Sequence, residues 1–230
     1  MNHKNNKARK CGIWVDLPIS DYAKIFHLQK RIHQKRQQET IPDVVLLLEH
    51  SPCITLGRSG GYDNLLAENS VLQQHGITVH ESSRGGNITY HGPGQLVCYP
   101  ILSLAEEERD LHAYARKMEE MMIRTVNAFG IKAGRRAGFP GVWAKETKIG
   151  AIGVAVDKWV TMHGMALNVC PDLSHFSFIV PCGIATHGVT SMEKLMGTSI
   201  DINSVRREMR NQFCEIFQIS MRSEKLEHII

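Results

Sequence analysis

The chain has 230 residues, of which 43% are hydrophobic and 22% charged, and this composition is ordinary for a folded soluble protein. A chain of this length suits one domain. The formal net charge is +4, but four basic residues and no acidic residue lie in the first ten positions, so the remainder is balanced. We expect a flexible basic tail over residues 1–10, one domain over residues 11–230, and no basic face for nucleic acid.

The sequence indicates neither a membrane span nor a metal site. The longest aliphatic run, Val44 to Leu48, is far shorter than the roughly 20 residues that cross a bilayer. Asp16 and Pro18 interrupt the apolar stretch after the tail, which excludes a signal peptide. The six cysteines form no C-x-x-C pair, and the histidines show no close ligand spacing. We expect a cytoplasmic protein with no membrane contact, metal or other cofactor.

Helical periodicity and β-branched runs predict the elements in chain order. The first half is expected to form a helix at 20–38, strands at 44–49 and 54–56, a short helix at 67–75 and several strands within 77–102. The second half is expected to form a helix at 111–129, strands at 141–144, 149–156 and 159–169, a short helix begun by the capping-box spacing of 190–193, and a last helix at 201–217.

These helices and strands do not alternate regularly along the chain. That order favours an α+β fold, a single domain in which helices flank mixed or antiparallel β-sheets. The apolar stripe of the helix at 111–129 is expected to pack in the core.

Residues 84–95 form the first of three segments that sheet packing alone does not explain. The segment reads Arg-Gly-Gly-Asn-Ile-Thr-Tyr-His-Gly-Pro-Gly-Gln. Paired glycines let a ligand lie directly against the backbone, and Arg84, Thr89 and His91 can supply polar contacts. From spacing alone, a plain glycine-rich hairpin with solvated side chains explains the pattern equally well.

The second segment begins at Lys148, which precedes a run of small apolar residues, and continues at 163–168, His-Gly-Met-Ala-Leu-Asn. A lysine at the start of a strand is usually a surface charge. If the fold buries Lys148, desolvation makes it able to exchange protons near neutral pH.

The third segment is Pro181-Cys182-Gly183, a rigid bend that can present a thiol. Cys98 and Cys214 are expected to be small buried hydrophobic residues instead. A free thiol is only a few per cent ionised at neutral pH, so a nucleophilic cysteine needs a neighbouring base or cation. Lys148 is a candidate, although spacing does not reveal whether the two side chains meet.

Taken together, these segments resemble the octanoyltransferase family, also called lipoate-protein ligase B. The family pattern R-G-G-x-x-T-aromatic-H-x-x-G-Q-x-aliphatic-x-Y matches residues 84–99 at every position. Further matches lie at 49–52, Thr55, 57–58, 141–143, 148–153, 163–169 and 181–183. The resemblance spans about residues 44–197. Cys53 departs from it, since an aliphatic residue is expected there, and we expect its thiol to be buried and inert.

The resemblance implies the fold of lipoate and biotin protein ligases and an enzyme that transfers octanoyl from acyl carrier protein to a lysine. The implied acceptors are lipoyl domains of 2-oxoacid dehydrogenase complexes and the glycine-cleavage H protein. Cys182 is implied to be the acyl-accepting nucleophile and Lys148 its acid/base partner. The implied substrate-binding residues are Arg84, Gly85, Gly86, Asn87, Ile88, Thr89, Tyr90, His91, Ala151, Ile152, Gly153, Gly164, Met165 and Ala166.

Two alternatives compete with this interpretation. An ATP-dependent lipoate or biotin ligase of the same fold would hold an acyl-adenylate on the glycine-rich segment and would need no cysteine. A non-catalytic module would only sequester the acyl group. Cys182 in its Pro-Gly setting favours the transferase over the ligase, and the presence of both Cys182 and Lys148 argues against the non-catalytic module.

Overall fold

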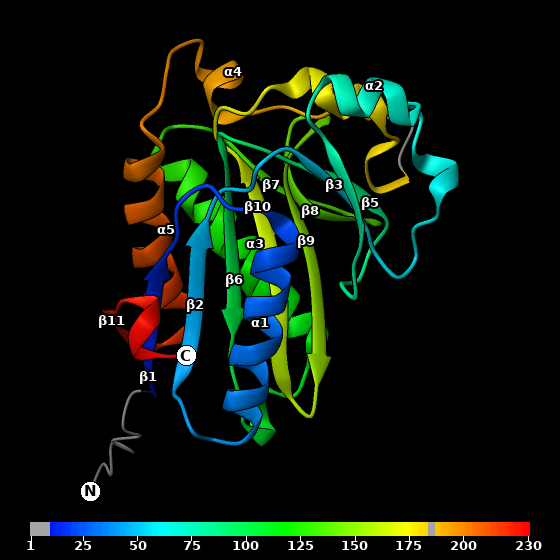
Figure 1. The fold of residues 1–230 in the computed structure, drawn as a ribbon. Coiled ribbons are helices and arrows are strands. Elements are labelled where there is room, and N and C mark those ends of the chain that lie inside the picture. The colour runs from blue at the N-terminus through cyan, green and yellow to red at the C-terminus, as the bar shows by residue number, and fades with distance from the viewer. Residues whose placement is uncertain (1–9, 184–186) are drawn as a thin grey trace, which may run out of the picture.

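The computed structural model describes residues 10–183 and 187–230, and its centre is a mixed eight-stranded sheet (Figure 1). The sheet order is β11 (Ile219–Ser223), β1 (Lys10–Asp16), β2 (Asp43–Leu48), β6 (Gln95–Ile101), β10 (Val160–Asn168), β9 (Thr147–Asp157), β8 (Phe139–Ala144) and β7 (Gly134–Arg136). Strands β11, β1 and β2 are parallel, and every later pair is antiparallel. The predicted basic tail lies outside the described residues except for Lys10, the first residue of β1.

A second, three-stranded sheet lies beside the first. Its order is β4 (Thr78–Glu81), β3 (Cys53–Leu56) and β5 (Ile88–His91). Strands β2 and β3 follow each other closely in the chain but belong to different sheets. The segment between them therefore passes from one sheet to the other, and the cavity described below lies between the two sheets.

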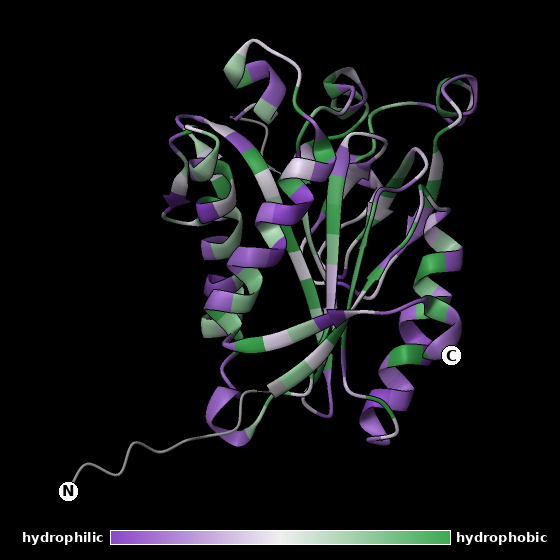
Figure 2. Cartoon of the chain, turned by 90° about the vertical axis from the view of Figure 1, so that its left-hand side faces the viewer, coloured by the Kyte–Doolittle hydropathy of each residue, from purple (hydrophilic) through white to green (hydrophobic). Residues whose placement is uncertain are grey.

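Helices cover both faces of the large sheet, as Figures 1 and 2 show. The helices are α1 (Tyr22–Gln37), α2 (Asn69–Gln74), α3 (Leu111–Ala128), α4 (Met192–Met196) and α5 (Ile202–Phe217). Helix α1 packs on β6 and β10, whereas α3 and α5 pack against each other on the opposite face. Asp21, Asp110 and Asp201 cap the N-termini of the three long helices by accepting backbone N–H bonds.

Strand β2 shows why the two faces form separate cores. All six of its residues are buried. Val45 and Leu47 pack toward α3 and α5, whereas Val44, Leu46 and Leu48 pack toward α1. A strand covered on both faces is a continuous apolar run rather than an alternating one, which is the pattern visible at 44–48. In Figure 2 the hydrophobic colour is concentrated on such central strands.

The α+β fold and the long helices agree with the sequence predictions, and three strands were not predicted. Strands β1, β7 and β11 lie toward the two edges of the large sheet. The expected capping box is displaced by one residue, because Ser191 rather than Thr190 accepts the cap bond, from Lys194 N. The hairpin turns are Lys145-Glu146 and Lys158-Trp159, each one residue away from its predicted position.

Within the described part of the chain, no helix is both long enough and apolar enough to cross a membrane.

Candidate active site

A cavity of about 370 Å³ lies between the large sheet, the small sheet and the N-terminal end of α1. Its floor consists of small residues paired across two adjacent strands, Ala151 with Ala166 and Gly153 with Gly164. Ala151 and Ala166 carry one methyl group each, so the sheet leaves room for a ligand above them, whereas backbone oxygens of Gly85 and Cys98 fill the space that a Cβ would take at Gly153 and Gly164. The volume lies within the range of pockets that hold small molecules.

Cys182 and Lys148 meet at the wall of this cavity, which spacing alone left open. Lys148 Nζ donates to Cys182 Sγ over 3.1 Å. Lys148 is 8% exposed and Cys182 is half-buried. A cationic donor next to a sulfur stabilises the thiolate form, which is the nucleophilic form of cysteine.

Backbone contacts bring these two distant residues together. Lys148 N donates to Gly188 O, and Thr190 N donates to Lys148 O, both over 2.9 Å. These bonds tie the start of β9 to the segment that follows Cys182 in the chain. The Lys148 side chain passes over Gly141, where an added Cβ would lie 2.7 Å from Lys148 Cε, so only glycine leaves that path open.

The backbone at Cys182 adopts a conformation that is uncommon for a residue with a side chain. Its φ is 57° and its ψ is 15°, and Gly183 follows with φ of 69°. A non-glycine residue in this left-handed region costs on the order of 1–2 kcal/mol. Gly183 N donates to Val180 O over 2.9 Å and closes the bend. The surrounding contacts therefore hold Cys182 in a strained backbone geometry.

Arg84 is a buried cation on the cavity wall. Its guanidinium donates to the backbone oxygen of Thr55 over 2.6 Å, to the Thr55 hydroxyl and to the backbone oxygen of Gly85. No carboxylate pairs with Arg84 in the described part of the chain. Burial lowers its pKa from the usual value, but an arginine remains protonated at working pH. Arg84 thus anchors residues 84–86 against β3.

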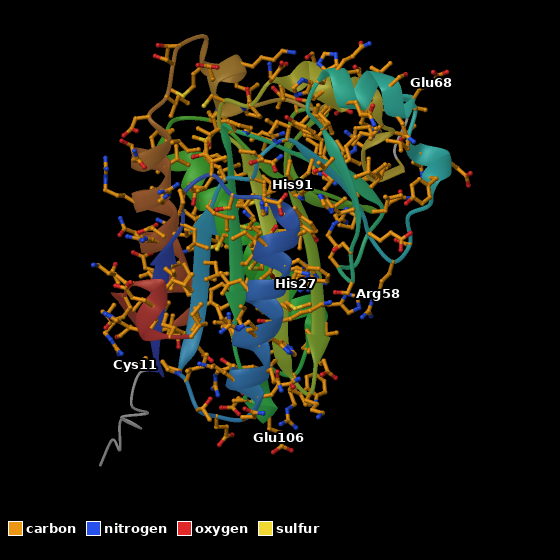
Figure 3. All side chains as sticks on the ribbon, in the orientation of Figure 1. Cys11, His27, Arg58, Glu68, His91 and Glu106 are labelled. Atoms are coloured by element: carbon orange, nitrogen blue, oxygen red, sulfur yellow. The ribbon has the colours of Figure 1, made fainter. Side chains whose placement is uncertain are left out.

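Three buried histidines near the cavity are held neutral. Burial lowers the pKa of His50 to about 4 and the pKa values of His91 and His163 to about 3. Gln95 fixes the tautomer of His91. Gln95 Nε2 donates to Asn168 Oδ1, so its Oε1 faces His91 Nδ1 at 2.6 Å and accepts the imidazole proton. His91, labelled in Figure 3, is buried at the end of β5, and its ring stacks on that of Tyr22 at the start of α1.

The structure places most of the sequence-predicted substrate-binding residues around one cavity. Arg84, Gly86, Asn87, Ile88, Thr89, His91, Ala151, Ile152, Gly153, Gly164, Met165 and Ala166 line it. Gly85 and Tyr90 do not. Gly85 N donates to Val154 O, and the Tyr90 side chain lies in the core of the small sheet with its hydroxyl 2.8 Å from His175 Nδ1.

Tyr22, Tyr99 and His163 also line the cavity, although the sequence assigned them no role. Tyr22 belongs to the apolar stripe of α1, and such a stripe predicts burial without revealing the neighbour. Tyr99 is the last position of the family pattern at 84–99, and His163 opens the segment at 163–168, but neither was expected to bind substrate. Cys53 is buried, as predicted, and burial raises the pKa of its thiol.

Within residues 10–183 and 187–230, no group of three or more His, Cys, Asp or Glu side chains could hold a metal ion.

We expect the protein to lose stability as the pH falls from about 6.5 toward 4. Unfolded His50 binds a proton near pH 6.5, whereas burial holds its folded pKa at about 4. Neutral buried His50 therefore contributes its full stabilisation above pH 6.5. This contribution, about 3 kcal/mol in total, is lost as the pH falls from 6.5 to the folded pKa of about 4. Urea unfolding at several pH values, with His50→Gln beside the wild type, checks this. The variant should show a shallower slope, and equal slopes would contradict the assignment.

Comparison with known proteins gives two groups of matches. The family model described as the lipoyl protein ligase A/B catalytic domain matches residues 21–214. An octanoyltransferase of Clostridium kluyveri is 42% identical over 217 residues, which cover 94% of this chain and 93% of that protein. An octanoyltransferase of Solibacter usitatus is 48% identical over 201 residues, which cover 87% of this chain and 90% of the relative.

Solved structures show the same fold at low sequence identity. Lipoate-protein ligase A bound with ATP has a TM-score of 0.75 and 16% identity, covering 95% of this chain and 92% of its own. A bipartite lipoate protein ligase from Thermoplasma acidophilum, described with its E2 lipoyl domain, has a TM-score of 0.72 and 18% identity. The match covers 96% of this chain and 90% of that ligase chain. Biotin protein ligase from Aquifex aeolicus has a TM-score of 0.55 and 14% identity. The match covers 91% of this chain and 71% of the biotin ligase chain.

Proposed function

Because the chain belongs to the octanoyltransferases within the lipoyl protein ligase A/B catalytic family, we propose that it transfers octanoyl from acyl carrier protein to a lysine through a thioester on Cys182. The observation that carries this proposal is the contact between Lys148 Nζ and Cys182 Sγ at the wall of the cavity. The proposed acceptors are lipoyl domains of 2-oxoacid dehydrogenase complexes and the glycine-cleavage H protein. The lipoate ligase described with its E2 lipoyl domain supports this class of acceptor.

In the proposed first step, Lys148 as ammonium stabilises the Cys182 thiolate. The sulfur attacks the carbonyl carbon of the carrier thioester, so a new carbon–sulfur bond forms and the bond to the carrier sulfur breaks. Lys148 gives its proton to the departing carrier thiolate and becomes neutral. Backbone N–H groups near Cys182 or in the glycine segments would stabilise the oxyanion of the tetrahedral intermediate that precedes loss of the carrier sulfur.

In the proposed second step, the neutral amine of the acceptor lysine attacks the Cys182 thioester. The amide bond forms, and the carbon–sulfur bond to Cys182 breaks. Lys148 takes up the proton that the amine nitrogen loses, which restores the starting ammonium and thiolate. Because the donor thioester is already activated, neither a nucleotide nor a metal ion is required for either step.

The cavity suits the octanoyl chain. Apart from Arg84, Lys148 and the Cys182 thiolate of the proposed mechanism, its lining is uncharged, since the histidines are held unprotonated by burial. About six buried methylenes at about 0.8 kcal/mol each would contribute on the order of 5 kcal/mol to acyl binding.

We propose the cytoplasm as the location. Cys53, Cys98, Cys170, Cys182 and Cys214 are free thiols, the form that persists in a reducing compartment.

The intact mass of the protein tests the proposal. After incubation with octanoyl-carrier protein, and without ATP or Mg²⁺, we expect the mass to rise by one octanoyl group in place of a proton. Adding a lipoyl domain should then remove this mass and transfer it to the domain. If the protein acylates a lipoyl domain only with free octanoate and ATP, it is a ligase, and the transferase proposal is wrong.

A further inference from the structure

His163 has an unusual backbone for a residue in the middle of a buried strand. Its φ is 60°, while β10 is buried along its whole length and His163 itself is 1% exposed. A non-glycine residue held in this region costs on the order of 1–3 kcal/mol and persists only where its surroundings over-determine it. This local distortion turns the imidazole into the cavity, which it lines.

Contacts from three directions hold His163 in place. Its backbone N–H donates to Gln29 Oε1 over 2.9 Å, and Gln29 is fully buried in α1. Its Nε2 lies 2.9 Å from the hydroxyl of Ser83, in the segment between β4 and β5. Its ring stacks on Phe26 of α1, with 5.4 Å between ring centres. The imidazole is therefore a rigid part of the wall rather than a side chain that can move aside.

Along β10, the distance from Ala166, which lies near Cys182, to His163 matches the length of an octanoyl chain. Ala166 borders a small void that Cys182 and Lys148 also line. His163 lies three residues farther along the strand, which is about 10 Å at ~3.3 Å per residue. The seven carbon–carbon bonds of an extended octanoyl chain advance about 1.25 Å each, so with its carbon–sulfur bond the chain reaches about 10 Å from the sulfur.

We propose that His163 forms the end wall of the acyl cavity and sets the longest acyl chain that the enzyme accepts, with Gln29 as the positioning residue that holds the wall. This inference rests on the proposed function, since it assumes that the acyl chain extends from Cys182 into the cavity. A chain with two further methylenes must displace an imidazole that is fixed at both its backbone and its ring.

Competition between acyl donors tests the inference. An equimolar mixture of hexanoyl-, octanoyl-, decanoyl- and dodecanoyl-carrier protein is offered to the wild type, His163→Asn and His163→Gly, and the acyl groups on the protein are read by intact mass. Asparagine and glycine both tolerate a positive φ, so the strand can keep its path. We expect the decanoyl-to-octanoyl ratio to rise about tenfold in the glycine variant, as two more buried methylenes allow, and less in the asparagine variant.

The hexanoyl-to-octanoyl ratio is the internal reference, because both chains end at or before His163. It should stay at the wild-type value, whereas a general packing defect would change every ratio. His75→Asn, the same change at an exposed histidine outside the cavity, should leave the whole profile unchanged.

A decanoyl-to-octanoyl ratio within twofold of the wild type in both His163 variants would overturn the inference. So would an equal shift in His75→Asn. A wild-type protein that no carrier thioester acylates would instead overturn the proposed function. Gln29→Ala should raise the same ratio with the imidazole still present, and an unchanged ratio there would remove the positioning role from Gln29.

Discussion

Replacing Cys182 with alanine is expected to abolish octanoyl transfer, with a loss of at least about 10³-fold, while the protein still folds. Without the sulfur no thioester can form, so both the mass increase on the protein and the amide product on the lipoyl domain should disappear. The side chain is half-buried on a bend rather than packed in a core, so its truncation should cost little stability. Intact mass and a thermal melt on the same sample measure both expectations.

Three other cysteines provide matched controls. Cys53→Ala and Cys98→Ala remove thiols that are fully buried in β3 and β6, and burial raises the pKa of each thiol, which disfavours a nucleophile. Cys170→Ala removes a thiol of intermediate exposure that does not line the cavity. Each control should keep most of the activity. Full activity in Cys182→Ala would refute the thioester on Cys182. Loss of activity in a folded Cys53→Ala or Cys98→Ala variant would show that another thiol is the nucleophile.

Replacing Lys148 is expected to separate its two proposed roles. Lys148→Ala removes both the cation and the proton carrier, so acylation of Cys182 should slow by about 10²–10⁴-fold. Lys148→Arg keeps a cation but cannot accept a proton at working pH. Arginine also cannot protonate the departing carrier sulfur, but a thiol with a pKa of about 8.5 can leave as the thiolate. The arginine variant should therefore still form the octanoyl-protein and stall before amide formation. Following thioester mass on the enzyme and amide mass on a lipoyl domain in one time course measures the two steps.

The control for this series is Lys145→Ala, which removes an exposed lysine from the β8–β9 turn three residues before Lys148. It should behave like the wild type. Near-normal turnover in Lys148→Arg would refute the proton-transfer role and leave Lys148 only as a fixed charge.

Periodicity predicted the parts of the fold in which one chain segment determines its own structure. Helix α3 follows from its apolar stripe, the Asp110 cap and the positive φ of Gly130, which ends it. Strands β7 and β11 were missed because they are short and largely exposed, so no alternation marks them. Strand β1 is defined by parallel pairing with β2 and β11, and such pairing between distant segments leaves no local signal.

The candidate site likewise has parts that local sequence predicts and parts that depend on contacts between distant segments. The glycine-rich residues 84–95 indicated a ligand surface because each glycine is a local backbone feature. The contact between Lys148 and Cys182 depends on backbone bonds from Lys148 to Gly188 and Thr190, which join segments far apart in the sequence. The neighbours of Tyr22 likewise depend on how α1 sits on the sheet. Sequence patterns therefore predicted which residues line the cavity better than which side chains contact each other.

The glycine floor of the cavity limits how this scaffold can change its substrate. A Cβ at Gly164 would lie 2.1 Å from the carbonyl oxygen of Cys98, and a Cβ at Gly153 would lie 2.9 Å from that of Gly85. Both obstacles are backbone atoms, so no rearrangement of side chains can relieve them. Any larger residue there disturbs the sheet before it can reshape the cavity. New acyl specificities in evolution or engineering must therefore arise in the walls that α1 and the segment before β5 contribute, while the floor stays invariant for reasons of folding.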